Sequence, residues 1–493
     1  MHTWVEQELA TADLGDERLN KRFRIVLEGM AQKPSLKFPA LFNGRSDVKR
    51  GYEFLDNPKV DEAKVFAPHR AATVERVRAY PVVIVPQDTT ELDVTRAHER
   101  MEGAGPLNEP TRLGFYNHVM LAFTPEGLPL GIVDAHVWAR DAEEFAKDAE
   151  RKRAGRKSRP IEAKESHRWL QGYRRACALA GEAAATVIVC VSDSEGDIYE
   201  CIQQGQAPAA AGQRKAEWII RACQDRRLKR PGDAEASVGE PAAAKLLERV
   251  AATPVLERIT VEVSRRVPKS KDPRKRRQPR SARTAVLAVR AARVTLHAPS
   301  RPGVKLADVE VNVVLVREIE PPPGEEAIEW LLLTSLPIGT IEEVLRVVAY
   351  YGCRWNIEIY FRILKSGCKV EESQLEKADR FRPYLALCMI VAWRVMYVMM
   401  LGRECPDLPC EAAFDDEEWR AVYAVVKDEV PPKEPPPLGE MVVLIAMLGG
   451  YMNRKGDGEA GPKAMWVGMQ RMTDLGLAWR AFARHGPEGH AKR

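Results

Sequence analysis

Two short runs of β-branched residues, each followed closely by acids, constrain the fold of this chain more than any other feature. Residues 82–85 read VVIV and are followed by Asp88, and residues 186–191 read TVIVCV and are followed by the acidic segment 193–197, DSEGD. Such apolar runs are typical of strands buried on both faces of a sheet. Acids at the ends of these strands reach the crevice where α/β proteins bind ligands. We therefore predict a mixed α/β core with carboxylates gathered at one edge.

The rest of the chain predicts helical regions on both sides of this core. Residues 1–75 mix basic and apolar side chains at helical spacing, and residues 401–493 form a helical C-terminal region in which a proline-rich linker from Pro431 precedes a mixed helical tail. Between them, residues 76–400 hold the core, which is interrupted at about 212–335 by several strand-like runs. We expect three domains, with a β-rich insertion in the middle one.

Local turn chemistry predicts two further elements. Pro125, Glu126 and Gly127 separate two apolar runs and indicate a β-hairpin. Thr340 and Glu343 have the spacing of a capping box and predict the start of a helix.

The overall composition is that of a soluble globular protein, but one basic segment has two interpretations. The chain is 45% hydrophobic and 29% charged with a net charge of only +5, which is ordinary for a soluble globular protein. Residues 264–283, however, contain ten Lys or Arg and a single Asp. This run is either a contact for a polyanion or a solvated loop.

Cysteine usage and hydropathy favour a cytoplasmic protein. Nine cysteines, an odd number without a C-x-x-C pair, indicate neither a disulfide framework nor a zinc site. Cys190 and Cys388 lie in apolar runs and are expected in the core. No charged-then-apolar leader opens the chain, and the most apolar stretch, 383–401, contains Arg394 and predicts a buried helix rather than a membrane span.

A later segment, YGCRWNIEIYFRILKSG from residue 351, places a single acid among cations. If the segment is one helix, Tyr351, Arg354, Glu358 and Lys365 fall within a sector of about 60°. Because Gly352 is a potential helix breaker, the prediction of a shared face is best supported from Arg354 onward. A surface stripe of salt bridges is one interpretation, and on this segment alone it is favoured.

The strand-end acids supply the other interpretation, in which Glu358 is a third metal ligand. Three converging carboxylates repel one another unless cations hold them, and a site built only from oxygen atoms selects Mg²⁺ or Mn²⁺. Two such ions catalyse in-line phosphoryl transfer. Within DSEGD, the pattern does not choose among Asp193, Glu195 and Asp197, although Asp193 comes first after the strand.

The spacing Tyr351-x2-Arg354-x3-Glu358-x6-Lys365 resembles the YREK signature of bacterial cut-and-paste insertion-sequence transposases with a DDE site, the family that includes the transposon-five transposase. The likeness covers nearly the whole chain, from LGDERLNKR near the N-terminus to MLGGYMNRKGDGEAGPKAMWVGMQRM near the C-terminus. It implies a ribonuclease H-like core, an N-terminal domain that binds the terminal repeats and a C-terminal dimerisation domain.

The resemblance also implies residue roles. It makes Asp88, Asp193 and Glu358 the catalytic acids that hold two Mg²⁺ ions, with Mn²⁺ as a substitute. The positions that it assigns to DNA are Tyr351, Arg354, Lys365, Trp330, Arg221, Arg362, Arg18, Arg22 and Lys33. Trp330 matches a platform for a flipped base, a role that suits an aromatic side chain.

Four positions depart from the family pattern. Ser194 stands where the relative has an Arg, which removes a cation beside the second acid, and Gly196 replaces an Ala. Ile359 and Phe361 make the motif helix more apolar than expected.

The function that the resemblance implies is DNA transposition by a homodimer in the bacterial cytoplasm, associated with the nucleoid. Double-stranded transposon ends would be cleaved through a hairpin and joined to target DNA, with salt-dependent binding. The alternatives are a catalytically silent DNA-binding or dimerising remnant or inhibitor, and a ribonuclease H-like nuclease without end specificity.

Overall fold

A computed structural model describes residues 3–33, 37–42, 44–96, 100–109, 111–146, 159–209, 212–229, 245–267, 279–301 and 303–485. The chain forms two compact units that interleave along the sequence. Unit 1 comprises Met1–Tyr80, Asp88–Lys147 and Trp355–Arg493, and unit 2 comprises Pro81–Gln87 and Asp148–Arg354. Most of the basic run, residues 268–278, lies outside the described residues, so both interpretations of it stay open.

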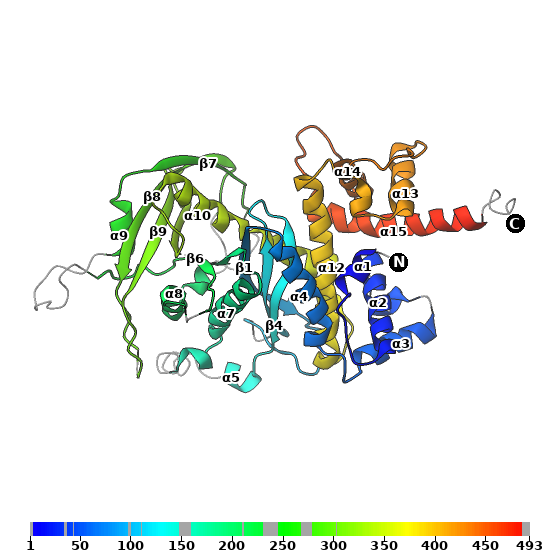
Figure 1. The fold of residues 1–493 in the computed structure, drawn as a ribbon, viewed down its shortest axis with the longest axis horizontal. Helices are drawn as coiled ribbons and strands as arrows, with labels where there is room; N and C mark the ends of the chain where they lie inside the picture. The colour runs from blue at the N-terminus through cyan, green and yellow to red at the C-terminus, as the bar shows by residue number, and fades with distance from the viewer. Residues whose placement is uncertain are drawn as a thin grey trace, which may run out of the picture. The chain divides into compact units, whose positions relative to one another are not determined.

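The N-terminal part of unit 1 is helical, as its sequence pattern predicts. Its helices are α1 (Thr3–Glu8), α2 (Glu17–Gln32), α3 (Arg45–Leu55) and α4 (Glu62–Arg78), with a 3₁₀ turn at Phe38–Leu41 (Figure 1). Asp16 and Asp61 cap α2 and α4, each accepting a hydrogen bond from a backbone N–H of the first turn. Phe23, Leu27 and Met30 supply much of the buried face of α2.

The predicted hairpin is confirmed in the same unit. Strands β3 (Leu113–Phe123) and β4 (Pro129–Trp138) pair antiparallel around the Pro125-Glu126-Gly127 turn. The short strand β2 (Gly105–Pro106) pairs with β3, and α5 (Ala142–Ala146) follows the hairpin.

A long apolar helix, α12 (Ala378–Glu404), forms the centre of unit 1. Within the described residues it is the one helix long and apolar enough to cross a membrane, but almost all of its most apolar window is buried in the protein. It contacts α2, α4 and β4. The prediction of a buried core helix is therefore confirmed.

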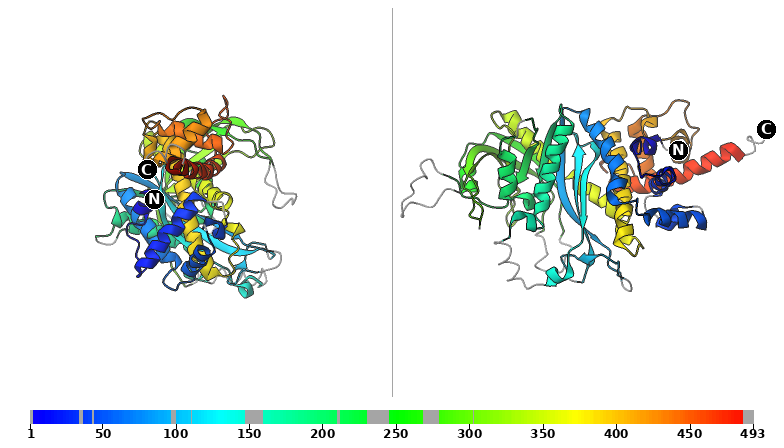
Figure 2. Two further views of the ribbon diagram at one scale, coloured as in Figure 1. Left: turned by 90° about the vertical axis from the view of Figure 1, so that its right-hand side faces the viewer. Right: turned by 60° about the horizontal axis from the view of Figure 1, so that its bottom comes forward.

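The remaining segments of unit 1 are also helical. Before α12 come α11 (Asn356–Arg362), a π-helical turn (Ile363–Gly367) and a 3₁₀ turn (Val370–Glu372); after it come a 3₁₀ turn (Cys410–Ala412), α13 (Asp416–Lys427), α14 (Leu438–Leu448) and α15 (Pro462–His485). The last three helices pack against one another, and Figure 2 shows them together near the C-terminus. The helical C-terminal region is as predicted.

Unit 2 contains most of the mixed sheet. Its strands are β5 (Val187–Ser192), β6 (Glu217–Arg221), β7 (Glu257–Val263), β8 (Arg283–Leu296), β9 (Val309–Glu318) and β10 (Glu329–Thr334). Strand β1 (Val82–Asp93) begins in this unit and ends in unit 1. The strand order of the sheet is β2-β3-β1-β5-β6-β10-β9-β8-β7, with β4 beside β3.

Strand direction separates the core of unit 2 from its insertion. Strands β1, β5 and β6 run parallel, and β6, β10, β9, β8 and β7 pair antiparallel in turn. Helix α7 (His167–Glu182) packs on β5, and α8 (Tyr199–Gln206), α9 (Leu246–Ala251) and α10 (Ile341–Cys353) each contact β9 (Figure 1). The 3₁₀ turns of this unit are Ile161–Ala163 and Ser194–Gly196. The protein is thus a mixed α/β fold with a large mixed sheet, in which strands β6 to β10 lie between residues 217 and 334.

Candidate active site

The first predicted acid, Asp88, lies inside a strand. The sequence predicts it just past the end of a strand, but β1 continues to Asp93, which corrects that prediction. Parallel pairing of β1 with β5 ends at Pro86, two residues before Asp88. The Thr89 N–H donates to Asp88 Oδ1 at 2.7 Å. Asp88 therefore follows directly on the parallel part of its strand.

The second acid, Asp193, occupies the equivalent position on the neighbouring strand. It follows Val191, the partner of Pro86, by two residues. Asp193 is half-buried, and its Oδ1 accepts the N–H of Glu195 at 2.8 Å. No cation within the described ranges forms a salt bridge with this carboxylate. The remaining lone pairs of this carboxylate suit a hard metal ion.

Asp197, the third acid of DSEGD, has a structural role. Its buried carboxylate accepts the backbone N–H groups of Cys223 and Gln224 at 2.9 and 3.0 Å. It also forms an ion pair with Arg226, whose side chain is 8% exposed. Because backbone donors and a guanidinium surround it, Asp197 joins the turn after β5 to the segment after β6 and does not compete for a metal.

Glu195 and Gly196 form the turn beside the second acid. The Glu195 carboxylate is largely exposed and accepts a hydrogen bond from Arg168 at 2.8 Å. A Cβ atom at Gly196 would lie 2.4 Å from Ser192 Oγ and 3.2 Å from the Trp169 ring. The absence of an Ala at this position therefore has a steric cause, because Ser192 and Trp169 occupy the space that a methyl group needs.

Three helical segments carry the YREK residues, which corrects the prediction of a single helix with one shared face. Helix α10 ends just before Arg354, α11 carries Glu358, and the π-helical turn carries Lys365. The Arg354 N–H donates to Tyr351 O and the Glu358 N–H to Trp355 O, both at 3.1 Å. These i→i+3 bonds and the π turn change the rotation per residue, so a constant 100° does not describe the segment. The predicted capping box of α10 and the stop at Gly367 are confirmed.

Four predicted DNA contacts lie together in unit 2. The rings of Trp330 and Tyr351 are 5.7 Å apart between centroids, tilted by 59°. Burial raises the pKa of Tyr351, and the positive charges of Arg354 and Arg221 partly offset that rise, which places both guanidiniums near the phenol. Arg221 also donates to the carbonyl of Glu329 at 3.4 Å. Strands β6 and β10 and helix α10 therefore bring one indole ring, one phenol and two guanidinium groups into one cluster.

Lys365 has a partner that the sequence analysis did not single out. Its Nζ lies 3.5 Å from Glu371 Oε1, and the same oxygen accepts the N–H of Asp93 at 2.9 Å. Both side chains of the ion pair are 29% exposed. Arg362, on α11, is exposed. No sequence signal identifies Glu371, because its contact with β1 spans 278 residues.

The three proposed metal ligands divide between the units, with Asp193 in unit 2 and Asp88 and Glu358 in unit 1. Within the described part of the chain, no group of three or more His, Cys, Asp or Glu side chains is arranged to hold a metal ion. The assignment of Asp88, Asp193 and Glu358 as metal ligands stays a prediction.

The N-terminal helices form a basic groove of about 540 Å³. Arg18 and Arg22 line it, whereas Lys33, at the C-terminal end of α2, does not. Arg22 lies 3.6 Å from Asp47. The groove also contains Lys21 and Arg50, which the sequence analysis missed. Helical spacing from Arg18 could have indicated Lys21, but Arg50 comes from another helix.

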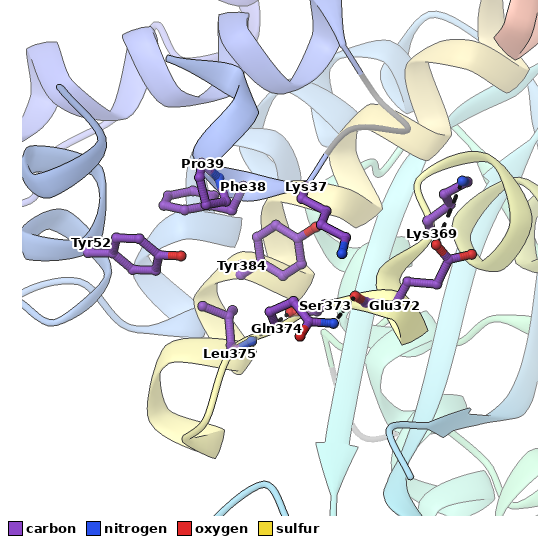
Figure 3. A pocket seen from close by; sticks show the side chains of 10 residues that line it. All are labelled: Lys37, Phe38, Pro39, Tyr52, Lys369, Glu372, Ser373, Gln374, Leu375 and Tyr384. Carbon is purple, nitrogen blue, oxygen red and sulfur yellow. Dashed lines mark hydrogen bonds and ion pairs between the residues drawn. The ribbon is translucent and has the colours of Figure 1, made fainter. Parts of the chain in front are cut away.

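A small aromatic cavity in unit 1 is not a further nucleotide site. Its volume is about 20 Å³, which suits about one water molecule. Figure 3 shows Phe38, Tyr52 and Tyr384 around it, with Lys369 paired to Glu372 at its rim.

Comparison with known proteins identifies three regions of the chain. Residues 1–60 match a transposase DNA-binding domain, residues 205–394 a transposase DDE domain, and residues 390–486 the transposase Tn5 dimerisation domain. One similar solved chain belongs to the "Cryo-EM structure of piggyBac transposase synaptic complex with hairpin DNA". It is 10% identical, covers 81% of this chain and 72% of that chain, and has a TM-score of 0.34.

The three domain matches follow one another along the chain, and the YREK residues fall within the DDE match. The chain therefore belongs to the Tn5-like transposases and is a DDE transposase, a member of a family of phosphoryl-transfer enzymes with DNA-binding and dimerisation domains.

Proposed function

We propose that this protein cleaves the ends of its own transposon through a DNA hairpin and joins them to target DNA. The observation that carries the proposal is that Asp88 and Asp193 each follow by two residues the last paired residues of β1 and β5, Pro86 and Val191. Glu358, on α11, completes the proposed triad on a ribonuclease H-like core. Two acids that follow the parallel-paired parts of neighbouring strands fit a site for hard divalent cations.

Asp88, Asp193 and Glu358 would hold two Mg²⁺ ions, or Mn²⁺ in their place. When bound, these ions supply activation of the attacking oxygen and stabilisation of the leaving oxygen. The protein's own carboxylates bind and orient the ions, and Asp193 has an oxygen free of backbone donors for this purpose.

The cluster of Trp330, Tyr351, Arg354 and Arg221 would bind the cleaved DNA end. Arg354 and Arg221 are suited to phosphate oxygens, because a guanidinium donates two parallel hydrogen bonds. The half-buried Trp330 ring offers a stacking face for a base displaced by the sharp bend of a hairpin. The cluster therefore positions the DNA end while the acids position the ions.

The remaining parts of the proposal concern the assembly. The N-terminal groove around Arg18 and Arg22 would bind the terminal repeat, with Lys33 and Arg362 as additional phosphate contacts. The C-terminal helices would join two protomers, each holding one transposon end. The nine cysteines are all free, which supports a reducing bacterial cytoplasm and action on nucleoid DNA.

Single substitutions of the triad test the proposal. We expect Asp88→Ala, Asp193→Ala and Glu358→Ala each to abolish Mg²⁺-dependent nicking and hairpin formation on a matched transposon end. Binding of the same DNA, measured by fluorescence anisotropy, should stay within about 3-fold of wild type, since phosphate contacts dominate affinity. Glu372→Ala is the matched control, because Glu372 is an exposed acid on the 3₁₀ turn that follows the motif residues.

Retained cleavage in any triad variant would refute that residue's assignment. A wild-type protein that binds ends but never cleaves them would instead indicate the silent remnant or inhibitor. Cleavage without preference for the transposon end would indicate the nuclease.

A further inference from the structure

Ser194, the residue directly after the second acid, carries no charge, and another element of the structure brings a cation to the same turn. Arg168, on the first turn of α7, directs its guanidinium to the turn that follows β5. Its Nη2 donates to Glu195 Oε2 at 2.8 Å, and its Nη1 donates to the carbonyl of Glu165 at 3.0 Å. A positive charge therefore reaches Glu195, in the same turn, from 27 residues earlier in the chain.

The Arg168 end of this contact is anchored. Its side chain is 14% exposed, against 62% for Glu195, and the following residue, Trp169, is buried against the same turn. The carbonyl bond to Glu165 fixes the guanidinium independently of Glu195. Arg168 therefore holds Glu195, rather than the reverse.

Glu195 passes this restraint to the second acid through the backbone. Its N–H donates to Asp193 Oδ1 at 2.8 Å, and the next N–H, that of Gly196, donates to the Asp193 carbonyl at 3.1 Å. The turn spans only Ser194–Gly196, so a restraint on the Glu195 side chain limits the orientation of the N–H that contacts Asp193.

We propose that Arg168 is a positioning residue that acts through Glu195 to orient the Asp193 carboxylate, and that it supplies the positive charge that Ser194 does not. The inference rests on the proposed role of Asp193 as a metal ligand. The Arg168–Glu195 pair acts on the orientation of the carboxylate rather than on the stability of the fold, because a partly exposed ion pair contributes little to stability.

The experiment compares Arg168→Ala, Arg168→Lys and the double variant Arg168→Ala/Ser194→Arg with wild type. End cleavage is measured against Mg²⁺ concentration, and Mn²⁺ binding to the protein–DNA complex is measured by titration calorimetry. We expect Arg168→Ala to raise the half-saturating Mg²⁺ concentration and the Mn²⁺ dissociation constant by about 10-fold, the lower end of the range for residues that orient metal ligands. The rate at saturating Mg²⁺ should change by less than about 2-fold, because the ligands themselves remain.

Rescue and coupling distinguish positioning from a general structural role. Arg168→Lys and the Ser194→Arg double variant should recover most of the metal affinity. Glu195→Gln should weaken metal binding as Arg168→Ala does, and the two together should be no worse than either alone. Wild-type metal affinity in Arg168→Ala, additive effects with Glu195→Gln, or a loss that Ser194→Arg does not restore would each overturn the inference. Failure of the wild-type protein to cleave DNA would instead refute the proposed function.

Discussion

At the scale of single residues, the environment decides which charged side chain is available for DNA. Lys365 is one of the four residues of the YREK motif, yet in the free protein Glu371 lies beside its ammonium group at 3.5 Å. Glu371 is itself oriented by the Asp93 N–H. A phosphate that binds Lys365 must therefore compete with a carboxylate already in place.

Glu371→Gln tests this competition. The amide oxygen can still accept the Asp93 N–H, but the negative charge is gone, so Lys365 is released for phosphate. We expect a 2- to 5-fold tighter complex with transposon-end DNA, since a partly exposed ion pair is worth up to about 1 kcal/mol. Fluorescence anisotropy at fixed salt measures the change.

Lys365→Ala provides the control for this prediction. The gain should disappear in the double variant Glu371→Gln/Lys365→Ala if it passes through Lys365. Weaker or unchanged binding of Glu371→Gln alone would contradict the competition.

At the scale of elements, close helix packing defines the C-terminal region. Helices α14 and α15 approach so closely at Gly468 that a Cβ atom there would lie 1.9 Å from the carbonyl oxygen of Ile445. A second close approach occurs at Gly449, where a Cβ would lie 1.8 Å from the Ala464 carbonyl. In both cases the obstacle is backbone, which cannot rotate away as a side chain can.

Gly468→Ala should therefore destabilise the region that matches the dimerisation domain. We expect a loss of about 1–3 kcal/mol, the usual cost of overpacking, seen as a lower midpoint in thermal unfolding and as weaker self-association in sedimentation. Gly181→Ala, inside α7, is the matched control, because no atom lies within 4 Å of its added Cβ. That change should be neutral or stabilise by up to about 1 kcal/mol. Equal effects of the two substitutions would contradict the packing argument.

At the scale of the whole molecule, residues far apart in the sequence are joined by contacts that respond to pH. Glu62, at the start of α4, lies 3.6 Å from Arg382 on α12. Burial raises the pKa of the Glu62 carboxyl to about 7, and the attraction of Arg382 only partly offsets it. The folded protein therefore binds this proton more tightly than the unfolded chain does, and the resulting stability is lost as the pH rises from about 4.5 through 7.

Glu62→Gln keeps the side chain neutral at every pH. We expect a similar free energy of unfolding to wild type at pH 4.5 and a gain of about 1–3 kcal/mol at pH 8, because one pKa unit corresponds to about 1.4 kcal/mol. Urea unfolding at the two pH values measures it. Glu75→Gln, an exposed acid on the same helix, should show no such pH dependence. A gain of the same size at both pH values would contradict the assignment.

Interactions within a few residues made much of this fold predictable. The buried strands before Asp88 and Asp193, the β3–β4 hairpin and the capping box at Thr340 follow from hydrophobic runs and turn chemistry, which act over a few residues. The motif helix was predicted less well. Its break before Glu358 arises where i→i+3 hydrogen bonds replace the regular pattern, and residue spacing alone does not reveal that change.

The sequence by itself determined which residue types the candidate site contains and which buried strands lie beside its first two acids. Only the tertiary structure decided that Asp197 pairs with Arg226 and leaves Asp193 as the candidate ligand, that Arg168 contacts Glu195, and that Glu371 lies beside Lys365. The physical reason is the range of the interactions. Strands and turns depend on neighbouring residues, whereas the partner of a charged side chain depends on which distant segments the folded core brings into contact.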